Sequence, residues 1–255
     1  WLSAIDADDL EALTARFPTP AGFERVDVAT DSYAQFLRGL PVYRGQRDVH
    51  AYDGRVIRAP SAAVVALDVG ERNLQQCADT VIRLHAEYLW ATERPGAIAY
   101  HFTSGDRSAW SDWAAGERFR VRGSSVDRVR TGAKSSSREN FRAYLDHVFM
   151  YAGTRSLRHD SARVDTILPG TFFVAPGSPG HAVVVLDVAE NDDGQRVALL
   201  GQGFMPAQEL HVLRGHANKT VDGVWWPLPG DGEKLDTPSW APFHRDDARA
   251  FKTPS

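Results

Sequence analysis

The fold is decided by three runs in the C-terminal half: Thr171-Phe-Phe-Val-Ala175, Ala182-Val-Val-Val-Leu-Asp-Val188 and Val197-Ala-Leu-Leu200. β-Branched and aromatic residues at this density are typical of strands. The turn sequence Asp192-Asp-Gly194 separates the last two runs and predicts an antiparallel hairpin. Unbroken valines need a covering layer, so helices must pack on the sheet. The sequence therefore predicts an α+β fold, with helices packed on a mainly antiparallel sheet.

The covering helices are found in the N-terminal half. The clearest lies over Asn73 to Thr92, and a second lies over Ser136 to Gly153, both with apolar residues at helical spacing. Shorter helices are predicted over Asp6 to Phe17 and over Asp31 to Arg38. We expect a single domain over 1–255, with a helical part over 1–153, a β-rich part over 154–220 and an irregular tail over 221–255.

Composition excludes several classes of protein. The 255 residues carry a net charge of −4 with both signs evenly mixed, which argues against nucleic-acid binding. No apolar run approaches the roughly 20 residues that a membrane-spanning helix needs. A single cysteine excludes an internal disulfide and a multi-cysteine metal cluster. Without His-Glu-x-x-His or a glycine-rich phosphate loop, we expect neither a bound metal nor a cofactor, and the oligomeric state stays open.

The single thiol is the strongest chemical candidate. Cys77 falls in the first turn of the Asn73 to Thr92 helix, where free backbone N–H groups and the helix dipole favour a thiolate. A nucleophilic thiol needs a base, and His181 fits because it follows a Pro-Gly turn and opens a predicted strand. Gln202, at the end of the next strand, would orient the imidazole. The alternative for Cys77 is a buried apolar filler of the helix stripe.

Polar side chains around Cys77 are candidates for binding substrate. The backbone N–H of Cys77, helped by Gln75 or Gln76, would stabilise an oxyanion. Asp79 and Arg83 lie on the polar side of the same helix, where Arg83 would be available to a carboxylate. The alternative is an ordinary solvated helix face with i, i+4 pairs.

The order of these elements resembles that of known cysteine hydrolases. A cysteine at a helix start is followed by the strand Leu168-Pro-Gly-Thr-Phe-Phe173, then by Pro179-Gly-His-Ala-Val-Val-Val185, then by a polar residue on the next strand. This order is similar to that of the papain-like hydrolases of the cell-wall amidase and endopeptidase type. The resemblance implies a Cys-His-polar triad and a peptide or peptidoglycan-like substrate.

A second resemblance is to an uncharacterised bacterial family, the domain of unknown function 4846. The matching stretches are Leu74-Gln-Gln-Cys-Ala-Asp79, Ala86-Glu-Tyr-Leu89, Phe102-Thr-Ser-Gly105, Tyr151-Ala-Gly-Thr154, Pro179-Gly-His-Ala182 and Met205-Pro-Ala-Gln208. This resemblance implies an exported bacterial protein, which would be periplasmic, anchored at the outer membrane or extracellular. It implies no reaction.

Two functions fit the sequence. One is a cysteine-dependent hydrolase or transferase acting on peptide or amide bonds through Cys77, His181 and Gln202. The other is a non-catalytic exported binding domain on the same fold. A thiol of low pKa favours the first function, and a buried, inert Cys77 favours the second.

Overall fold

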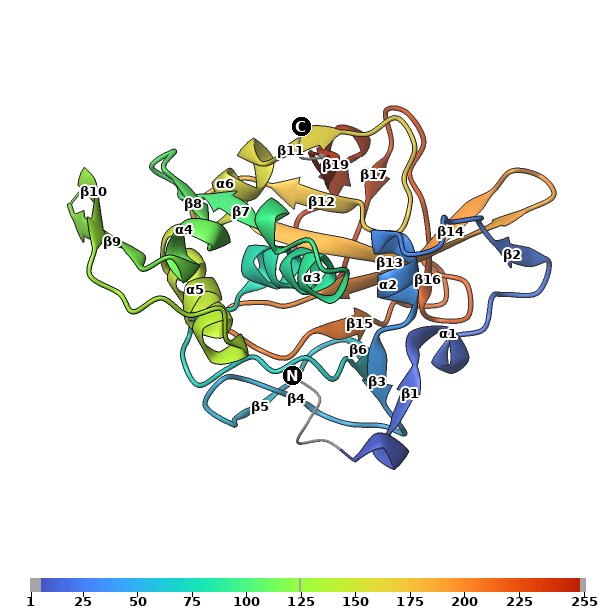
Figure 1. Cartoon of the computed structure of the whole chain (residues 1–255). Helices are drawn as coiled ribbons and strands as arrows, with labels where there is room; N and C mark the ends of the chain where they lie inside the picture. Colours follow the sequence, from blue (N-terminus) through green and yellow to red (C-terminus); the bar gives the residue numbers. More distant parts are fainter. Residues whose placement is uncertain (1–5, 124, 253–255) are drawn as a thin grey trace.

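The structure is a computed structural model that describes residues 6–123 and 125–252, and these residues form the predicted α+β fold (Figure 1). Its centre is an antiparallel sheet in which β12, β13, β14 and β15 are neighbours in chain order. The strands of this sheet are β2 (Phe23–Arg25), β6 (Ser61–Val64), β11 (Ser161–Arg163), β12 (Phe172–Ala175), β13 (His181–Asn191), β14 (Arg196–Gln202), β15 (His211–Leu213), β16 (Trp225–Pro227) and β19 (Ala248–Phe251). The three β-rich runs predicted to pair do so, with Phe172 opposite Val184 and Val185 opposite Leu200.

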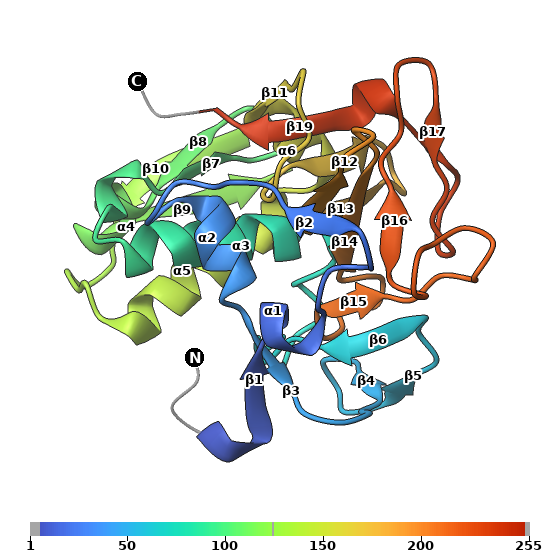
Figure 2. The same ribbon diagram turned by 90° about the vertical axis from the view of Figure 1, so that its right-hand side faces the viewer.

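Helices cover one face of this sheet. The helices of the described residues are α1 (Leu13–Arg16), α2 (Tyr33–Arg38), α3 (Cys77–Ala91), α4 (Trp110–Ala114), α5 (Arg138–Tyr151) and α6 (Thr154–His159). Figure 2 shows α2, α3 and α5 on one side of β13 and β14, with β16 and β17 on the other. None of the helices in the described part of the chain is long and apolar enough to span a bilayer.

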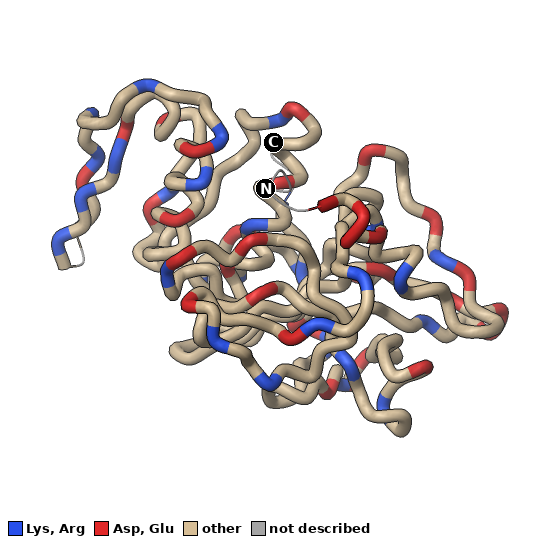
Figure 3. Tube along the Cα trace, turned by 90° about the horizontal axis from the view of Figure 1, so that it is seen from below, with Lys and Arg blue, Asp and Glu red and all other residues tan. Residues whose placement is uncertain are grey.

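Smaller two-stranded sheets lie around the central one. They pair β1 (Leu10–Ala12) with β3 (Pro41–Tyr43), β4 (Val49–His50) with β5 (Val56–Ile57), β7 (Ala99–His101) with β8 (Arg107–Ala109), β9 (Glu117–Arg122) with β10 (Ser125–Arg130), and β17 (Lys234–Leu235) with β18 (Phe243–His244). Single 3-10 turns are formed by Ala7–Asp9, Pro95–Ala97 and Arg245–Asp247. The β9–β10 hairpin projects from the body (Figure 1). Charges of both signs are interspersed along the chain (Figure 3).

Alternate residues of β13 serve two hydrophobic cores. Ala182 and Val184 belong to the larger core, which is shared with α3 and α5. Val183 and Val185 belong to a second core on the opposite face, which contains Phe243 of β18. The period of two in a strand thus places neighbouring side chains on opposite faces of the sheet.

Two sequence predictions are wrong. Residues 6–17 form a 3-10 turn, a strand and a single helical turn rather than one helix, because β1 pairs with β3 and a short isolated helix is marginal. The tail over 221–255 is not irregular throughout. β16 pairs with β14 and β19 pairs with β12, and both pairings join segments too far apart in sequence for local periodicity to indicate.

Candidate functional site

The helix α3 begins at Cys77, later than the predicted start at Asn73, so Cys77 lies in its first turn as predicted, and this turn is held by its own side chains. Asp79 Oδ2 accepts a hydrogen bond from the backbone N–H of Gln76 at 3.1 Å. Thr80 donates its hydroxyl to the carbonyl of Gln76 at 2.8 Å. Gly203 is packed so tightly here that a Cβ on it would lie 2.4 Å from the Thr80 hydroxyl. The N-terminus of α3 is therefore held against the chain that leaves β14.

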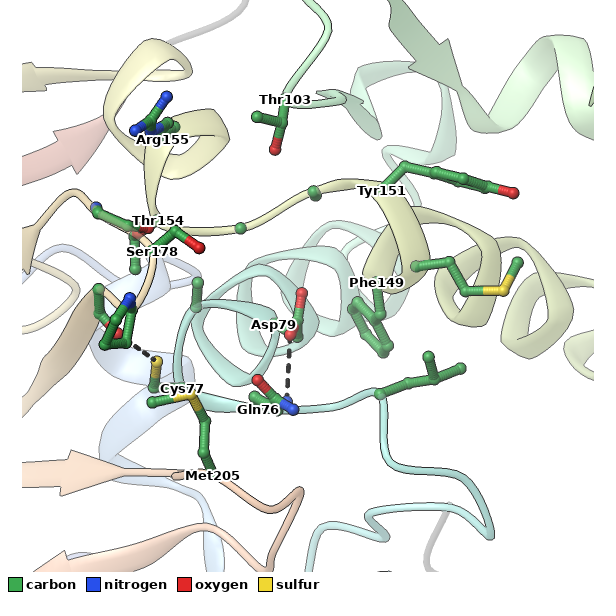
Figure 4. Close-up of a pocket in the computed structure, with 18 of the residues that line it drawn as sticks. Gln76, Cys77, Asp79, Thr103, Phe149, Tyr151, Thr154, Arg155, Ser178 and Met205 are labelled. Carbon is green, nitrogen blue, oxygen red and sulfur yellow. Dashed lines mark hydrogen bonds between the residues drawn. The ribbon is translucent and has the colours of Figure 1, made fainter. Parts of the chain in front are cut away.

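A pocket of about 700 Å³ opens at this end of α3 (Figure 4). Cys77 lines it, although only 4% of the residue is exposed. The polar side chains around the pocket come from four parts of the chain and are those of Asn73, Gln76, Asp79, Thr103, Tyr151, Thr154, Arg155 and Ser178. Phe149, Met150 and Met205 contribute apolar surface. A mixed lining of this kind suits a ligand with both polar and apolar groups.

The Cys77 thiol lies beside the backbone on both sides of His181. It donates to the carbonyl of Gly180 with an Sγ–O distance of 3.9 Å, and the backbone N–H of Ala182 donates to the sulfur. Burial raises the pKa of the thiol to about 11, with a smaller contribution from the charge of Asp79. The expectation of a lowered thiol pKa is therefore wrong for this conformation, because desolvation outweighs the effect of the helix N-terminus.

His181 and Gln202 are joined as the sequence predicted. His181 Nε2 and Gln202 Oε1 are 3.0 Å apart, and both side chains are buried. Burial lowers the pKa of His181 to about 4, so the ring is neutral at pH 7. Its second nitrogen, Nδ1, is buried and has no hydrogen-bond partner within the described residues. A buried ring nitrogen without a partner calls for an explanation, and a catalytic role is one.

The thiol of Cys77 lies beside the backbone that carries His181, but it is not hydrogen-bonded to the imidazole ring. The His181 ring packs against Phe204, Trp240 and Phe243, with ring centroids 4.9, 5.1 and 6.0 Å away. Phe243 belongs to the core on the face of the sheet away from α3. The thiol hydrogen bond goes instead to the Gly180 carbonyl. The structure thus brings together His181 with Gln202, and Cys77 with the backbone beside His181.

The predicted substrate-binding residues fall into two groups. Gln76 and Asp79 line the pocket, and Asp79 Oδ1 is buried there without a hydrogen-bond partner among the described residues. Burial raises the pKa of Asp79 well above its usual value. In Figure 4 one carboxyl oxygen of Asp79 is bonded to Gln76 while the other points into the pocket. A protonated Asp79 would donate a hydrogen bond from that second oxygen to a ligand.

Gln75 and Arg83 lie elsewhere, in a buried polar network. Arg83 donates to Gln75 Oε1 at 3.0 Å, to Asp68 at 2.8 Å and to Glu87 at 2.6 Å. Arg83 is 1% exposed and Gln75 is fully buried, and neither lines the pocket. These two residues hold the loop before α3. The alternative prediction, that Arg83 and Glu87 lie on a solvated face of the helix, is wrong, because both side chains are buried.

Sequence reasoning missed the far wall of the pocket, which includes Thr103, Tyr151, Thr154 and Met205. A signal was present. These residues fall in the stretches Phe102–Gly105, Tyr151–Thr154 and Met205–Gln208 that carried the family resemblance. Together with the stretches around Cys77 and Gly180, five of the six matching stretches contribute to one pocket.

One group of side chains has the composition of a metal site. The ligand atoms of His101, His159 and Asp160 lie within 4.8 Å of one another. Asp160 Oδ1 is 2.5 Å from His101 Nδ1 and 3.3 Å from His159 Nδ1. Hydrogen bonds to one carboxylate account for this proximity, and none of the three residues lines the pocket at α3.

The comparisons with known proteins give a family but no reaction. No curated protein and no solved structure matches the chain significantly, so the papain-like resemblance has no support from them. The family model for the domain of unknown function 4846 matches residues 13–249. The chain therefore belongs to the family described as Domain of unknown function (4846).

Proposed function

We propose that this chain is a cysteine-dependent hydrolase or transferase that acts on peptide or amide bonds, with Cys77 as nucleophile, His181 as base and Gln202 as the residue that orients the base. The observation that carries the proposal is a buried His181 that is bonded to Gln202 through Nε2 and has its Nδ1 free, at the start of a strand whose preceding carbonyl contacts the thiol of a cysteine at a helix N-terminus. A histidine held by one ring nitrogen, with the other free, is the arrangement that a general base requires.

The proposed reaction starts from a neutral thiol and a neutral imidazole, as the pKa directions of both groups require. The thiol proton passes to Nδ1 of His181 as the sulfur attacks the carbonyl carbon. The carbonyl oxygen becomes an oxyanion, which the N–H of Cys77 stabilises. The amine leaves with the proton from the imidazolium, and water or a second amine then breaks the thioester.

One conformational step separates the described arrangement from this pair. The thiol donates to the Gly180 carbonyl, and the ring of His181 packs on the far face of the sheet. The sulfur lies beside the backbone of residue 181 on the α3 side, whereas the ring packs on the opposite face, so the start of β13 at His181 must rearrange together with the side chain before Nδ1 can meet the sulfur. Contacts of this kind often form only when substrate is bound.

A second candidate function is a binding domain that does no chemistry at Cys77. The observation that favours it is the burial of the thiol, which raises its pKa to about 11. The pocket would then bind a peptide-like ligand through the N-terminus of α3 and the Asp79 carboxyl. Cys77 would be a small apolar part of the wall.

Alkylation of Cys77 by iodoacetamide at pH 7 separates the two functions. If His181 is the base, His181→Ala slows alkylation by ~10²-fold, in line with the usual effect of a general base. His147→Ala is the matched control, since this histidine also has a pKa lowered by burial to about 4 but lies away from the pocket. Equal alkylation rates in wild type and His181→Ala would leave the binding function as the better account.

A further inference from the structure

A buried chain of hydrogen bonds continues from His181 beyond Gln202. The Gln202 amide nitrogen lies 3.4 Å from His211 Nε2 and 3.1 Å from the hydroxyl of Ser239. His211 Nδ1 lies 3.1 Å from the backbone carbonyl of Glu209. His211 is fully buried and sits directly opposite Gln202 in the pairing of β14 with β15.

This chain has a fixed direction, because its last member can only accept. The Glu209 carbonyl oxygen has no proton, so His211 Nδ1 must carry one. A neutral His211 then has its lone pair on Nε2 and accepts from Gln202, which must turn its NH₂ group that way. The amide oxygen of Gln202 is left facing His181 and accepts a proton from Nε2. The lone pair of His181 is therefore on Nδ1.

The opposite direction places like groups against each other. If Gln202 turned its oxygen toward His211, His211 Nε2 would carry the proton and its Nδ1 lone pair would face the Glu209 carbonyl. Only a doubly protonated His211 would avoid this, and burial lowers the pKa of His211 to about 4. The Glu209 carboxylate is not the partner of His211, because it is bonded to Arg47 and to the backbone of His50.

We propose that His211 is a positioning residue which, through the Glu209 carbonyl on one side and the Gln202 amide on the other, holds His181 in the tautomer whose Nδ1 is free to take a proton. This inference rests on the proposed function for its catalytic meaning. The tautomer itself is a property of the resting protein and is measured without any substrate.

The experiment is ¹⁵N NMR of histidine side chains in the full chain at pH 7, combined with Cys77 alkylation. In wild type we expect the proton of His181 on Nε2 and that of His211 on Nδ1. The opposite tautomer at either ring overturns the proposal, and this test needs no variant.

Variants then test whether His211 is the cause. His211→Phe keeps an aromatic ring at this position and removes both hydrogen bonds, so we expect His181 to populate both tautomers and alkylation to fall several-fold. His211→Gln can donate to the Glu209 carbonyl and accept from Gln202, and it should restore both readouts. A folded His211→Phe protein with His181 still wholly in the Nε2–H form contradicts the proposal. Should His211→Phe not fold, failure of a folded His211→Gln protein to keep the Nε2–H form contradicts it.

The two proposals fail in different ways. If the tautomers are as expected but His181→Ala does not slow alkylation, the catalytic function is lost and the hydrogen-bond chain remains as a structural feature. If His181→Ala slows alkylation while the tautomers are reversed, the function stands and the role of His211 is lost.

Discussion

At the scale of single residues, burial decides the charge states around the pocket. Cys77 was expected to be a thiolate because it begins a helix, yet desolvation raises its pKa to about 11. Asp79 lies in the first turn of the same helix, and burial raises its pKa as well. For a nearly inaccessible group, the free energy lost by removing a charge from water is larger than the stabilisation that the helix N-terminus gives to a negative charge. A sequence shows the helix position but not the depth of burial.

Asp79→Asn tests the protonation of this carboxyl. The pKa of Asp79 is higher in the folded state than in the unfolded state, so the folded state binds the extra proton and loses stability as pH rises above the unfolded value of about 3.9. An asparagine keeps an oxygen for the N–H of Gln76 and cannot ionise. We expect the free energy of unfolding of Asp79→Asn to gain on that of wild type between pH 4 and pH 8 in urea titrations. Asp79→Ala, which loses the cap, should cost about 0.5–2 kcal/mol. A constant difference between Asp79→Asn and wild type across this range would contradict the account.

At the scale of elements, α3 connects sequence, core and site. Its predicted apolar stripe is buried, and Leu84 is fully inaccessible in the core shared with β13. Its polar side is also buried, because Arg83 pairs with Glu87 on the same helix and with Asp68 in the loop before it. Both the apolar and the polar side of α3 are therefore packed, which fixes the position of Cys77 at the start of the helix.

Leu84→Ala should therefore cost about 2–5 kcal/mol of unfolding free energy, as truncations in a packed core do. Leu168→Ala is the matched control, since Leu168 is 42% exposed and its loss should cost less than about 0.5 kcal/mol. Equal losses for the two variants in denaturant melts would show that α3 does not pack as described.

Local patterns predicted the elements that stand on local signals. The helix over Tyr33–Arg38 begins after Ser32, whose hydroxyl accepts from Gln35, and the hairpin of β13 and β14 has the turn that its sequence indicates. Elements that depend on distant partners were not predictable. β1 forms because β3 lies beside it, and β16 because β14 does. Within the site, the pairing of His181 with Gln202 was predicted from strand order, whereas the orientation of the ring away from the thiol follows from Phe243 and Trp240, which a local pattern cannot place.

At the scale of the whole molecule, buried and half-buried histidines set the response to acid. Burial lowers the pKa of His85 to about 3 and those of His147, His181 and His211 to about 4. Between these values and the unfolded value of about 6.5 the unfolded state binds more protons, so stability falls as pH falls. Asp79 acts in the opposite direction but is outnumbered.

We expect the free energy of unfolding to drop by at least ~2 kcal/mol between pH 7 and pH 4, since each pKa unit corresponds to about 1.4 kcal/mol. Urea titrations at half-unit pH steps measure this. The His85 ring stacks on Phe251, and a phenylalanine at position 85 would keep a ring there that takes up no proton. His85→Phe should therefore flatten the dependence of the unfolding free energy on pH. A profile that stays level in wild type would mean that these rings are charged or accessible in the folded state.

If His181 activates Cys77, a crystal structure of the protein treated with a peptide aldehyde will show the two side chains together at the modified sulfur. The account predicts a covalent bond from the sulfur to the aldehyde carbon, with the new oxygen near the N–H of Cys77 and His181 Nδ1 within about 4 Å of the sulfur. The 3.0 Å contact between His181 Nε2 and Gln202 should remain, with the Gln202 side chain following the ring if the ring moves. An unmodified Cys77, or an adduct with the imidazole still packed against Trp240 and Phe243 and its Nδ1 turned away from the sulfur, would contradict the claim.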